Sequence, residues 1–329
     1  MNAAMKKRIV ICGATGFIGR NLAEHFAAVG TYNVVGVHNR RPPYSCVGVE
    51  WVKADLTRHD DVERALDGAD ILIQAAATTS GARDIVMRPH IHVADNAVMN
   101  SLLFRAAHDR GIEHVVFFSC TVMLPSSPRA LRETDFDANA ALYPRYFGTG
   151  WTKVYIEKMC EFYSSVGSTK YTAIRHSNIY GPHDKFDLEH SHVFGATVTK
   201  VMTATDGRIT VWGTGEEARD LLYVGDLVDF VTRAIERQTV PFGLYNCGSG
   251  EATPINEIIA RIVAKSGRQL TIEYDLGQPT IKTSVFVDCS KAAHELGWHR
   301  STSLDEGIAR TIGWWKANVA GQVMARAQP

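Results

Sequence analysis

Residues 8–19, RIVICGATGFIG, decide the fold of this chain. The apolar run predicts a buried strand, the glycines predict a tight turn, and the residues that follow predict a helix. Gly13 permits the turn, Gly16 lets the backbone approach a pyrophosphate, and Gly19 lets the helix pack on the sheet. The helix N-terminus would supply N–H donors to phosphates. The residues expected to bind a dinucleotide here are Gly13, Thr15, Gly16, Phe17, Ile18 and Gly19.

The first two-thirds of the chain alternates short apolar strands with amphipathic helices. This pattern predicts a Rossmann-type α/β fold, a doubly wound parallel sheet with helices on both faces. Strands are expected at Arg8–Cys12, Tyr32–His38, Glu50–Lys53, Ile71–Gln74, His114–Ser119 and Thr172–His176. Helices are expected at Asn21–Val29, Asp60–Leu66, Ala94–Arg110 and Thr152–Ser165.

From residue 177 the pattern changes to Gly, Pro and His loops with shorter elements. These elements are expected at Phe194–Thr205, Thr210–Trp212, Asn256–Lys265 and Thr271–Asp275. We therefore expect residues 1–176 to form mainly the dinucleotide-binding domain. Residues 177–318 would form a smaller substrate lobe with strands returning to the main sheet, and 319–329 a tail.

Composition narrows the class of protein. The net charge is zero, so no bulk electrostatic binding of nucleic acid is expected. Six scattered cysteines without a C-x-x-C pair argue against a zinc site or a disulfide framework and favour a reducing compartment. No apolar run approaches membrane-spanning length, and MNAAMKKR is no signal sequence. These features predict a soluble cytoplasmic protein with no metal and no membrane segment.

The end of the second strand bears on cofactor choice. NAD-binding proteins usually carry an acidic residue there, whereas this chain has Asn39-Arg40-Arg41. Two arginines could pair with a 2′-phosphate, so NADP(H) is favoured; NAD(H) stays possible if they form only a solvated loop. After the third strand an acidic residue can bind the adenine amino group, and after the fourth small residues admit the cofactor. These residues are Asp55, Leu56, Ala75, Ala76 and Ala77.

Four later motifs carry a family resemblance: NIYGPHDKF at 178–186, SHV at 191–193, VWGTG at 211–215 and RDLLYVGD at 219–226. Over residues 8–315 the chain resembles the extended short-chain dehydrogenase/reductases of the NAD-dependent epimerase/dehydratase family. Within that family it is most similar to the GDP-L-fucose synthases. The resemblance implies 3,5-epimerisation and 4-keto reduction of a GDP-linked 4-keto-6-deoxyhexose, or action on a related heptose.

The resemblance also implies roles for single residues. Lys153 would bind the nicotinamide ribose and lower the pKa of a neighbouring proton donor. His192 would act as acid–base histidine, with His183 and His190 as rivals. Asn96, Asn178 and Ile179 would join the cofactor site. The residues implied to contact the sugar nucleotide are Asn178, His192, Val193, Lys200, Trp212, Arg219 and Lys282.

The chain departs from the family at its catalytic tyrosine. The family pattern Tyr-x-x-x-Lys ends at Lys153, and its tyrosine position holds Thr149. A lysine and the cofactor charge can bring a phenol's pKa towards neutrality, which makes it an acid–base group. The threonine hydroxyl has no accessible anion near neutral pH, so it can donate a hydrogen bond but cannot serve as that base.

Two further positions differ. A gapless reading places Cys120 where the family has a catalytic Ser or Thr, and a shift of one residue would bring in Ser119 or Thr121. The same reading puts Val122 where fucose synthases carry their epimerase cysteine, which argues against 3,5-epimerisation.

Proton transfer could therefore come from elsewhere: His192, Cys120, a water held by Thr149, or a nearby tyrosine. Tyr155 should point off the active face, and Tyr143 and Tyr146 are expected to precede the helix, so that only a distorted loop would bring them in.

Three functions remain open. The first is C4 hydride transfer with NADP(H), and the second is an epimerase or dehydratase that retains NAD(H). The third is a binding protein that has lost catalytic activity, either in evolution or through a deliberate Tyr→Thr substitution. By analogy the helices 94–110 and 152–165 would build a homodimer interface, and the apolar residues that could form it are Phe104, Tyr155, Met159 and Phe162.

Overall fold

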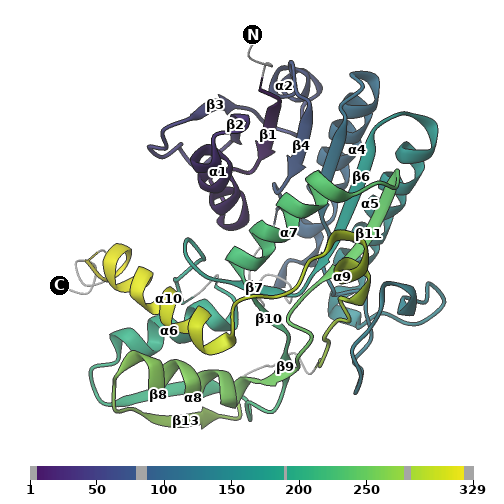
Figure 1. Ribbon diagram of the computed structural model, residues 1–329. Coiled ribbons are helices and arrows are strands. Elements are labelled where there is room, and N and C mark those ends of the chain that lie inside the picture. Colours follow the sequence, from purple (N-terminus) through teal and green to yellow (C-terminus); the bar gives the residue numbers. More distant parts are fainter. Residues whose placement is uncertain (1–5, 79–86, 189–190, 278–282, 322–329) are drawn as a thin grey trace.

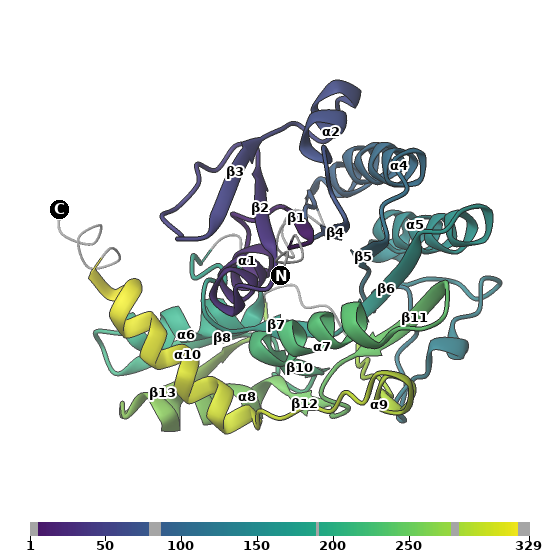
Figure 2. The same cartoon turned by 45° about the horizontal axis from the view of Figure 1, so that its top comes forward.

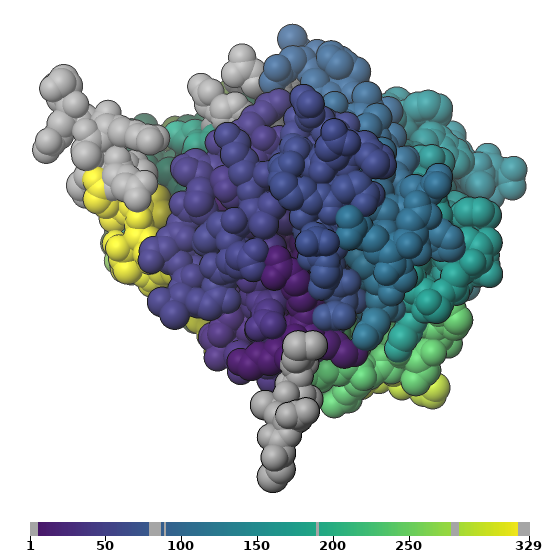
Figure 3. Space-filling model, turned by 90° about the horizontal axis from the view of Figure 1, so that it is seen from above, coloured from purple at the N-terminus to yellow at the C-terminus, as the bar shows by residue number. Residues whose placement is uncertain are grey.

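The computed structural model describes residues 6–78, 87–188, 191–277 and 283–321. Seven parallel strands form one sheet in the order β11-β6-β5-β4-β1-β2-β3, which confirms the predicted doubly wound fold (Figure 1). The strands are β1 Arg8–Cys12, β2 Asn33–His38, β3 Val49–Lys53, β4 Ile71–Gln74, β5 His114–Phe118, β6 Lys170–His176 and β11 Phe242–Cys247. Seen from above, the N-terminal half, coloured purple to blue, forms most of that side of the molecule (Figure 3).

Helices cover both faces of the sheet because its strands are apolar on both faces. Ile9 and Ile11 of β1 face one core, whereas Val10 and Cys12 face the other. The first core is covered by α1 Phe17–Val29, α7 Val224–Arg237 and α9 Ser290–Leu296. The second is covered by α2 His59–Ala65, α4 Ala94–Asp109 and α5 Phe147–Val166.

A smaller lobe lies below the sheet in Figure 1 and is seen from another side in Figure 2. Its elements are α6 Val193–Thr203, β8 Arg208–Trp212, α8 Ile255–Ser266, β13 Thr271–Asp275 and α10 Leu304–Asn318. They share a third core that includes Phe194, Ile258 and Trp315. Short connecting elements are β7 Asn178–Tyr180, β9 Ala218–Arg219, β10 Leu221–Tyr223, β12 Thr253–Pro254, η1 Pro89–His92, η2 Glu133–Asp135 and η3 Pro144–Tyr146.

One difference from the predicted elements affects the site: α5 begins at Phe147 rather than at Thr152. Gly148 and Gly150 are poor helix formers, so the sequence pattern there is weak. Packing requires one of them, because a Cβ on Gly150 would lie 2.9 Å from Leu142 Cδ1. The earlier start makes Tyr146 the N-cap residue of α5, and no distorted loop is needed to bring it to the helix.

The helices carry polar faces throughout. Within the described ranges, none has both the length and the apolar character that a bilayer crossing would demand. Phe104, which the sequence offered as an interface residue, is fully buried in the core between α4 and the sheet. The predicted dimer surface therefore lacks this residue, because its side chain is already used inside the subunit.

Candidate active site

The turn after β1 tolerates only glycine at two positions. Gly13 has φ +73°, and a Cβ there would lie 2.7 Å from the backbone Cα of Ala76. A Cβ on Gly19 would lie 2.2 Å from the carbonyl oxygen of Gly13. The turn thus brings the start of α1 against the exit of β4, where Ala75 and Ala76 are half-buried and Ala77 is exposed.

The N-terminus of α1 fits an anionic ligand. Its N-cap is Gly16, no side chain caps it, and its first turn contains no acidic residue. The free backbone N–H groups and the helix dipole therefore favour negative charge at this end. Phe17 and Ile18 pack against the core and Thr15 is half-buried. These features fit the pyrophosphate of a dinucleotide.

The exit of β2 offers two unpaired cations. Asn39, Arg40 and Arg41 are exposed, and neither arginine has an ion-pair partner among the described residues. At the exit of β3, Asp55 Oδ1 accepts hydrogen bonds from Thr57 Oγ1 at 2.7 Å and from Thr57 N. These bonds lower the pKa of Asp55 and keep it an anionic acceptor. Its neighbour Leu56 is buried.

Asn96 is engaged with backbone rather than open to a ligand. Its amide nitrogen donates to Thr78 O at 3.0 Å and to His92 O at 2.9 Å, and its amide oxygen accepts from Thr78 N. It therefore holds the chain after β4 in place. Asn178 is exposed and donates to Asp220 O at 3.1 Å, while Ile179 is buried in the core.

The three residues after β5 differ in accessibility. Ser119 is buried and donates to Glu157 Oε1 at 2.5 Å, so its hydroxyl is committed within the fold. Cys120 and Thr121 are half-buried. Burial raises the pKa of the Cys120 thiol, and the charge of Lys153 opposes that rise. Cys120 and Thr121 are thus the groups of this segment that a ligand can reach.

Thr149 and Lys153 lie on one face of α5, one turn apart. Lys153 Nζ donates to the carbonyl oxygen of Phe118, the last residue of β5, at 2.7 Å. Burial lowers the pKa of Lys153, while Cys120 and Glu157 raise it. The ammonium group is therefore anchored at the end of β5 near Cys120.

His176, which the sequence analysis did not single out, lies at the end of β6. Its Nδ1 donates to Ser177 O at 2.7 Å, which leaves Nε2 as an acceptor. Burial, together with the charges of Lys153 and His192, lowers the pKa of His176 to about 4 against the opposing effect of its hydrogen bond to Ser177. His176 is thus neutral near pH 7. The sequence could have indicated His176 by its place at the end of a predicted strand, two residues before the motif that begins at Asn178.

His192 is the N-cap residue of α6. Its side chain is exposed, yet the protein around it still lowers its pKa, and Lys185 adds to this effect. Because His192 influences His176, which also senses Lys153, the three side chains share one region. His183, the alternative candidate for the acid–base histidine, has its Nε2 3.0 Å from Glu24 Oε2. The other alternative, His190, lies outside the described residues.

The lobe presents an aromatic face and two cations. Trp212 is 52% exposed and so is not a core side chain. Lys200 Nζ donates to Thr210 O at 2.8 Å and lies 5.8 Å from the centre of the Trp212 ring. Burial lowers the pKa of Arg219, and Tyr146 opposes this effect. Val193 is exposed, and Lys282 lies outside the described residues.

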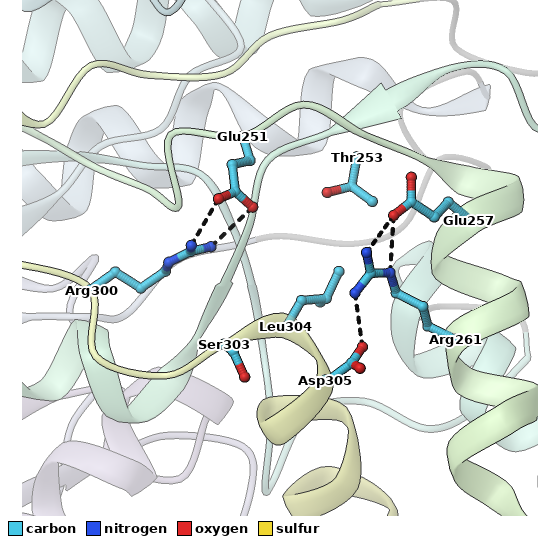
Figure 4. A pocket seen from close by; sticks show the side chains of 8 residues that line it. All are labelled: Glu251, Thr253, Glu257, Arg261, Arg300, Ser303, Leu304 and Asp305. Carbon is cyan, nitrogen blue, oxygen red and sulfur yellow. Dashed lines mark hydrogen bonds and ion pairs between the residues drawn. The ribbon is translucent and has the colours of Figure 1, made fainter.

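A cavity of about 310 Å³ between α8 and α10 lies elsewhere in the fold (Figure 4). In it Arg300 pairs with Glu251, and Arg261 pairs with Glu257 and Asp305. Its cations are already neutralised by neighbouring carboxylates. It includes none of the residues of the glycine turn or of α5, so it is not the catalytic centre.

Comparisons with known proteins identify the family of this chain. The sequence profile of the NAD dependent epimerase/dehydratase family matches residues 9–248, and the chain belongs to that family. The resemblance seen in the motifs is thereby confirmed.

Two curated relatives span nearly the whole chain. GDP-L-colitose synthase of Yersinia pseudotuberculosis is 26% identical over 94% of this chain and 97% of its own. GDP-L-fucose synthase of Escherichia coli K12 is 25% identical over 95% and 98%. Among solved structures, UDP-glucose 4-epimerase of Thermotoga maritima with UDP-glucose superposes with a TM-score of 0.83 at 22% identity, over 95% and 99%.

Proposed function

We propose that this protein transfers hydride at C4 of a GDP-linked 4-keto-6-deoxyhexose or heptose, with NADP(H) as cofactor. Residues 1–176 would bind mainly the dinucleotide and residues 177–318 mainly the nucleotide sugar. The observation that carries the proposal is the anchoring of Lys153 Nζ on Phe118 O, 2.7 Å away at the end of β5, with His176 at the end of the neighbouring strand β6. Parallel sheets bind their ligands at such strand ends.

The choice of GDP rests on two supports. Several relatives that span this chain bear the names of GDP-L-colitose synthase or GDP-L-fucose synthase, although one bears that of a dTDP-sugar reductase. The exposed indole of Trp212 can stack on a purine base, and the guanidinium of Arg219 can contact phosphate oxygens. The choice of NADP(H) rests on Arg40 and Arg41, which are exposed and positioned at the end of β2.

Isothermal titration tests the nucleotide directly. GDP should bind with at least tenfold higher affinity than UDP or dTDP, and Trp212→Ala should weaken GDP binding because stacking is lost. Arg310→Ala, a change at an exposed arginine of α10 that pairs with Glu306, serves as the control. If another nucleotide sugar bound tightly and the GDP-sugar did not bind, the assignment of GDP as the nucleotide would be wrong.

NADPH consumption tests the reaction. Absorbance is followed with GDP-4-keto-6-deoxymannose, and deuterium wash-in at C3 and C5 is measured in parallel. We expect NADPH oxidation without wash-in, because Val122 stands where an epimerase cysteine would be needed. Incorporation of deuterium at C3 or C5 would show that the protein also catalyses 3,5-epimerisation.

A second candidate is an epimerase or dehydratase that keeps NAD(H) bound. The superposition with a UDP-glucose 4-epimerase favours this alternative. The supernatant of denatured protein separates the two functions, since stoichiometric nicotinamide cofactor in it would indicate retention. The third possibility is a protein that binds cofactor or sugar nucleotide but catalyses no reaction. It is suggested by Thr149 and Cys120, which stand at the family's catalytic positions. Turnover of any sugar nucleotide would reject it.

We also propose a homodimer built on α4 and α5. Tyr155, Phe162 and Val166 are each more than half exposed on α5, at helical positions that share one face. Val98 of α4 is 45% exposed. An exposed apolar face of this kind is stabilised when a second copy covers it.

A further inference from the structure

We propose that Tyr146 is the catalytic acid of this active site, donating the proton that Thr149 cannot supply. The inference rests on the proposed function and names the group that completes it. A bound reduced nicotinamide would supply hydride to carbon C4 of the keto sugar. The Tyr146 O–H bond breaks while a new O–H bond forms at the C4 oxygen, and the phenolate then regains a proton from solvent.

The first support is the position of Tyr146 on the helix. It ends η3 and is the N-cap residue of α5, with φ −100° and ψ 0°. Thr149 follows three residues later and Lys153 seven residues later. At 3.6 residues per turn these three positions lie on one face of the helix. Position 146 therefore lies about one turn N-terminal of Thr149, along the helix face that carries Lys153.

The second support is its surroundings. The side chain of Tyr146 is half-buried, and no atom of the described residues forms a hydrogen bond with its hydroxyl. The charge of Arg219 and the thiol of Cys120 both influence its ionisation, so Tyr146 lies between the lobe and the end of β5. Burial raises the pKa of Tyr146, and the charge of Arg219 opposes that rise. The cation of Arg219 then stabilises the phenolate that remains.

The other donors fit less well. His176 is neutral, and its one N–H is already donated to Ser177 O. Tyr155 is 51% exposed on the outer side of α5, as the sequence predicted. Tyr143 precedes η3 and packs its ring against Tyr146, with 5.6 Å between the ring centres. The protein around His192 and the charge of Lys185 lower the pKa of this exposed histidine, which reduces the fraction that carries a donatable charge-bearing proton.

The test compares three single variants. Tyr146→Phe should lower kcat by about 10²–10⁴-fold, while GDP and NADPH affinities measured by titration calorimetry stay within about twofold. Tyr143→Phe and Tyr155→Phe are matched controls and should keep the wild-type rate. The double variant Tyr146→Phe/Thr149→Tyr should recover activity, because it returns a phenol to the same helix face.

The outcomes are distinct. Wild-type turnover with an equally fast Tyr146→Phe variant overturns the assignment and leaves the proposed function standing. Loss of both rate and ligand binding, without recovery in the double variant, makes Tyr146 a structural residue and also overturns it. A wild type inert towards every sugar nucleotide overturns the proposed function and this inference together. Slow turnover with intact binding and recovery in the double variant supports it.

Discussion

Ser119 donates its hydroxyl hydrogen to the buried carboxylate of Glu157, with 2.5 Å between the two oxygens. Glu157 also pairs with Arg175, whose Nη2 lies 2.7 Å from Glu157 Oε2. Both charged side chains are almost fully buried. This network joins β5, α5 and β6, and so fixes the strand ends that carry Cys120 and His176. A hydroxyl that the sequence offered for catalysis thus serves to position the site.

Glu157→Gln should destabilise the protein strongly. The variant leaves the Arg175 guanidinium buried without a counter-charge, and breaking such a pair costs about 3–5 kcal/mol. The free energy of unfolding in urea measures this loss. Glu161→Gln is the matched control on the same helix. Its ion pair with Lys158 is exposed, so the change should cost less than about 1 kcal/mol. Equal losses in the two variants would contradict the argument.

The sequence predicted the fold well where strands are buried on both faces. Arg8–Cys12 and Ile71–Gln74 were predicted with the bounds they have, because such strands read as continuous apolar runs. Phe242–Cys247 was not foreseen as a strand. Glycine and asparagine interrupt its pattern, and its pairing with β6 is a long-range contact that no local signal reveals.

The site was predictable only in part. The glycine turn follows from its place between a strand and a helix, whereas Lys153 is singled out only by the family resemblance. The engagement of Ser119 depends on Glu157 and Arg175, which are distant in sequence and meet only in the folded chain. The position of Tyr146 at the start of α5, on which its proposed role depends, was not predicted because two glycines weaken the helical pattern there.

Gly19→Ala should disrupt the cofactor turn. Its Cβ would lie 2.2 Å from Gly13 O, so the helix must shift, at a cost of about 1–3 kcal/mol. Thermal unfolding and NADPH titration should both record the loss. Gly313→Ala is the control, because a Cβ there meets no atom within 4 Å. In the exposed interior of α10 it should raise stability by up to about 1 kcal/mol. A harmless Gly19→Ala would refute the close packing of the turn.

Replacing Arg40 and Arg41 by alanine should weaken NADPH binding and leave NADH binding nearly unchanged. A charge-assisted hydrogen bond to phosphate contributes about 1.5–3 kcal/mol, so the NADPH affinity should fall at least about tenfold. Fluorescence titration with each cofactor measures the ratio. Arg105→Ala, an exposed arginine paired with Asp109 on α4, is the control. If the affinities for NADPH and NADH fell equally, Arg40 and Arg41 would not be the residues that bind the 2′-phosphate.

Phe162→Glu should shift the protein towards the monomer. The side chain is 57% exposed on α5, and a carboxylate buried between two copies would lack a partner. Sedimentation velocity at several concentrations measures the change. Val29→Glu, 52% exposed at the end of α1, lies on the opposite face of the sheet and should leave the assembly unchanged. A wild type that sediments as a monomer would reject the proposed interface.

Mild acid should destabilise the protein through buried histidines. His114 Nε2 lies 2.8 Å from Thr172 Oγ1, and burial lowers the pKa of His114 from 6.5 to about 4. Between these values the unfolded chain binds a proton that the folded chain does not. Stability contributed by neutral His114 is therefore present near pH 7 and falls as the pH falls.

The loss attributable to His114 should be about 2 kcal/mol between pH 7 and pH 5. Urea unfolding of wild type and His114→Asn at both pH values isolates it, since the asparagine variant should be less stable at pH 7 but lose less on acidification. His59→Asn is the control, because that ring is exposed to solvent in the folded protein. An unchanged pH dependence in His114→Asn would assign the acid sensitivity to other groups, with the buried His176 first among them.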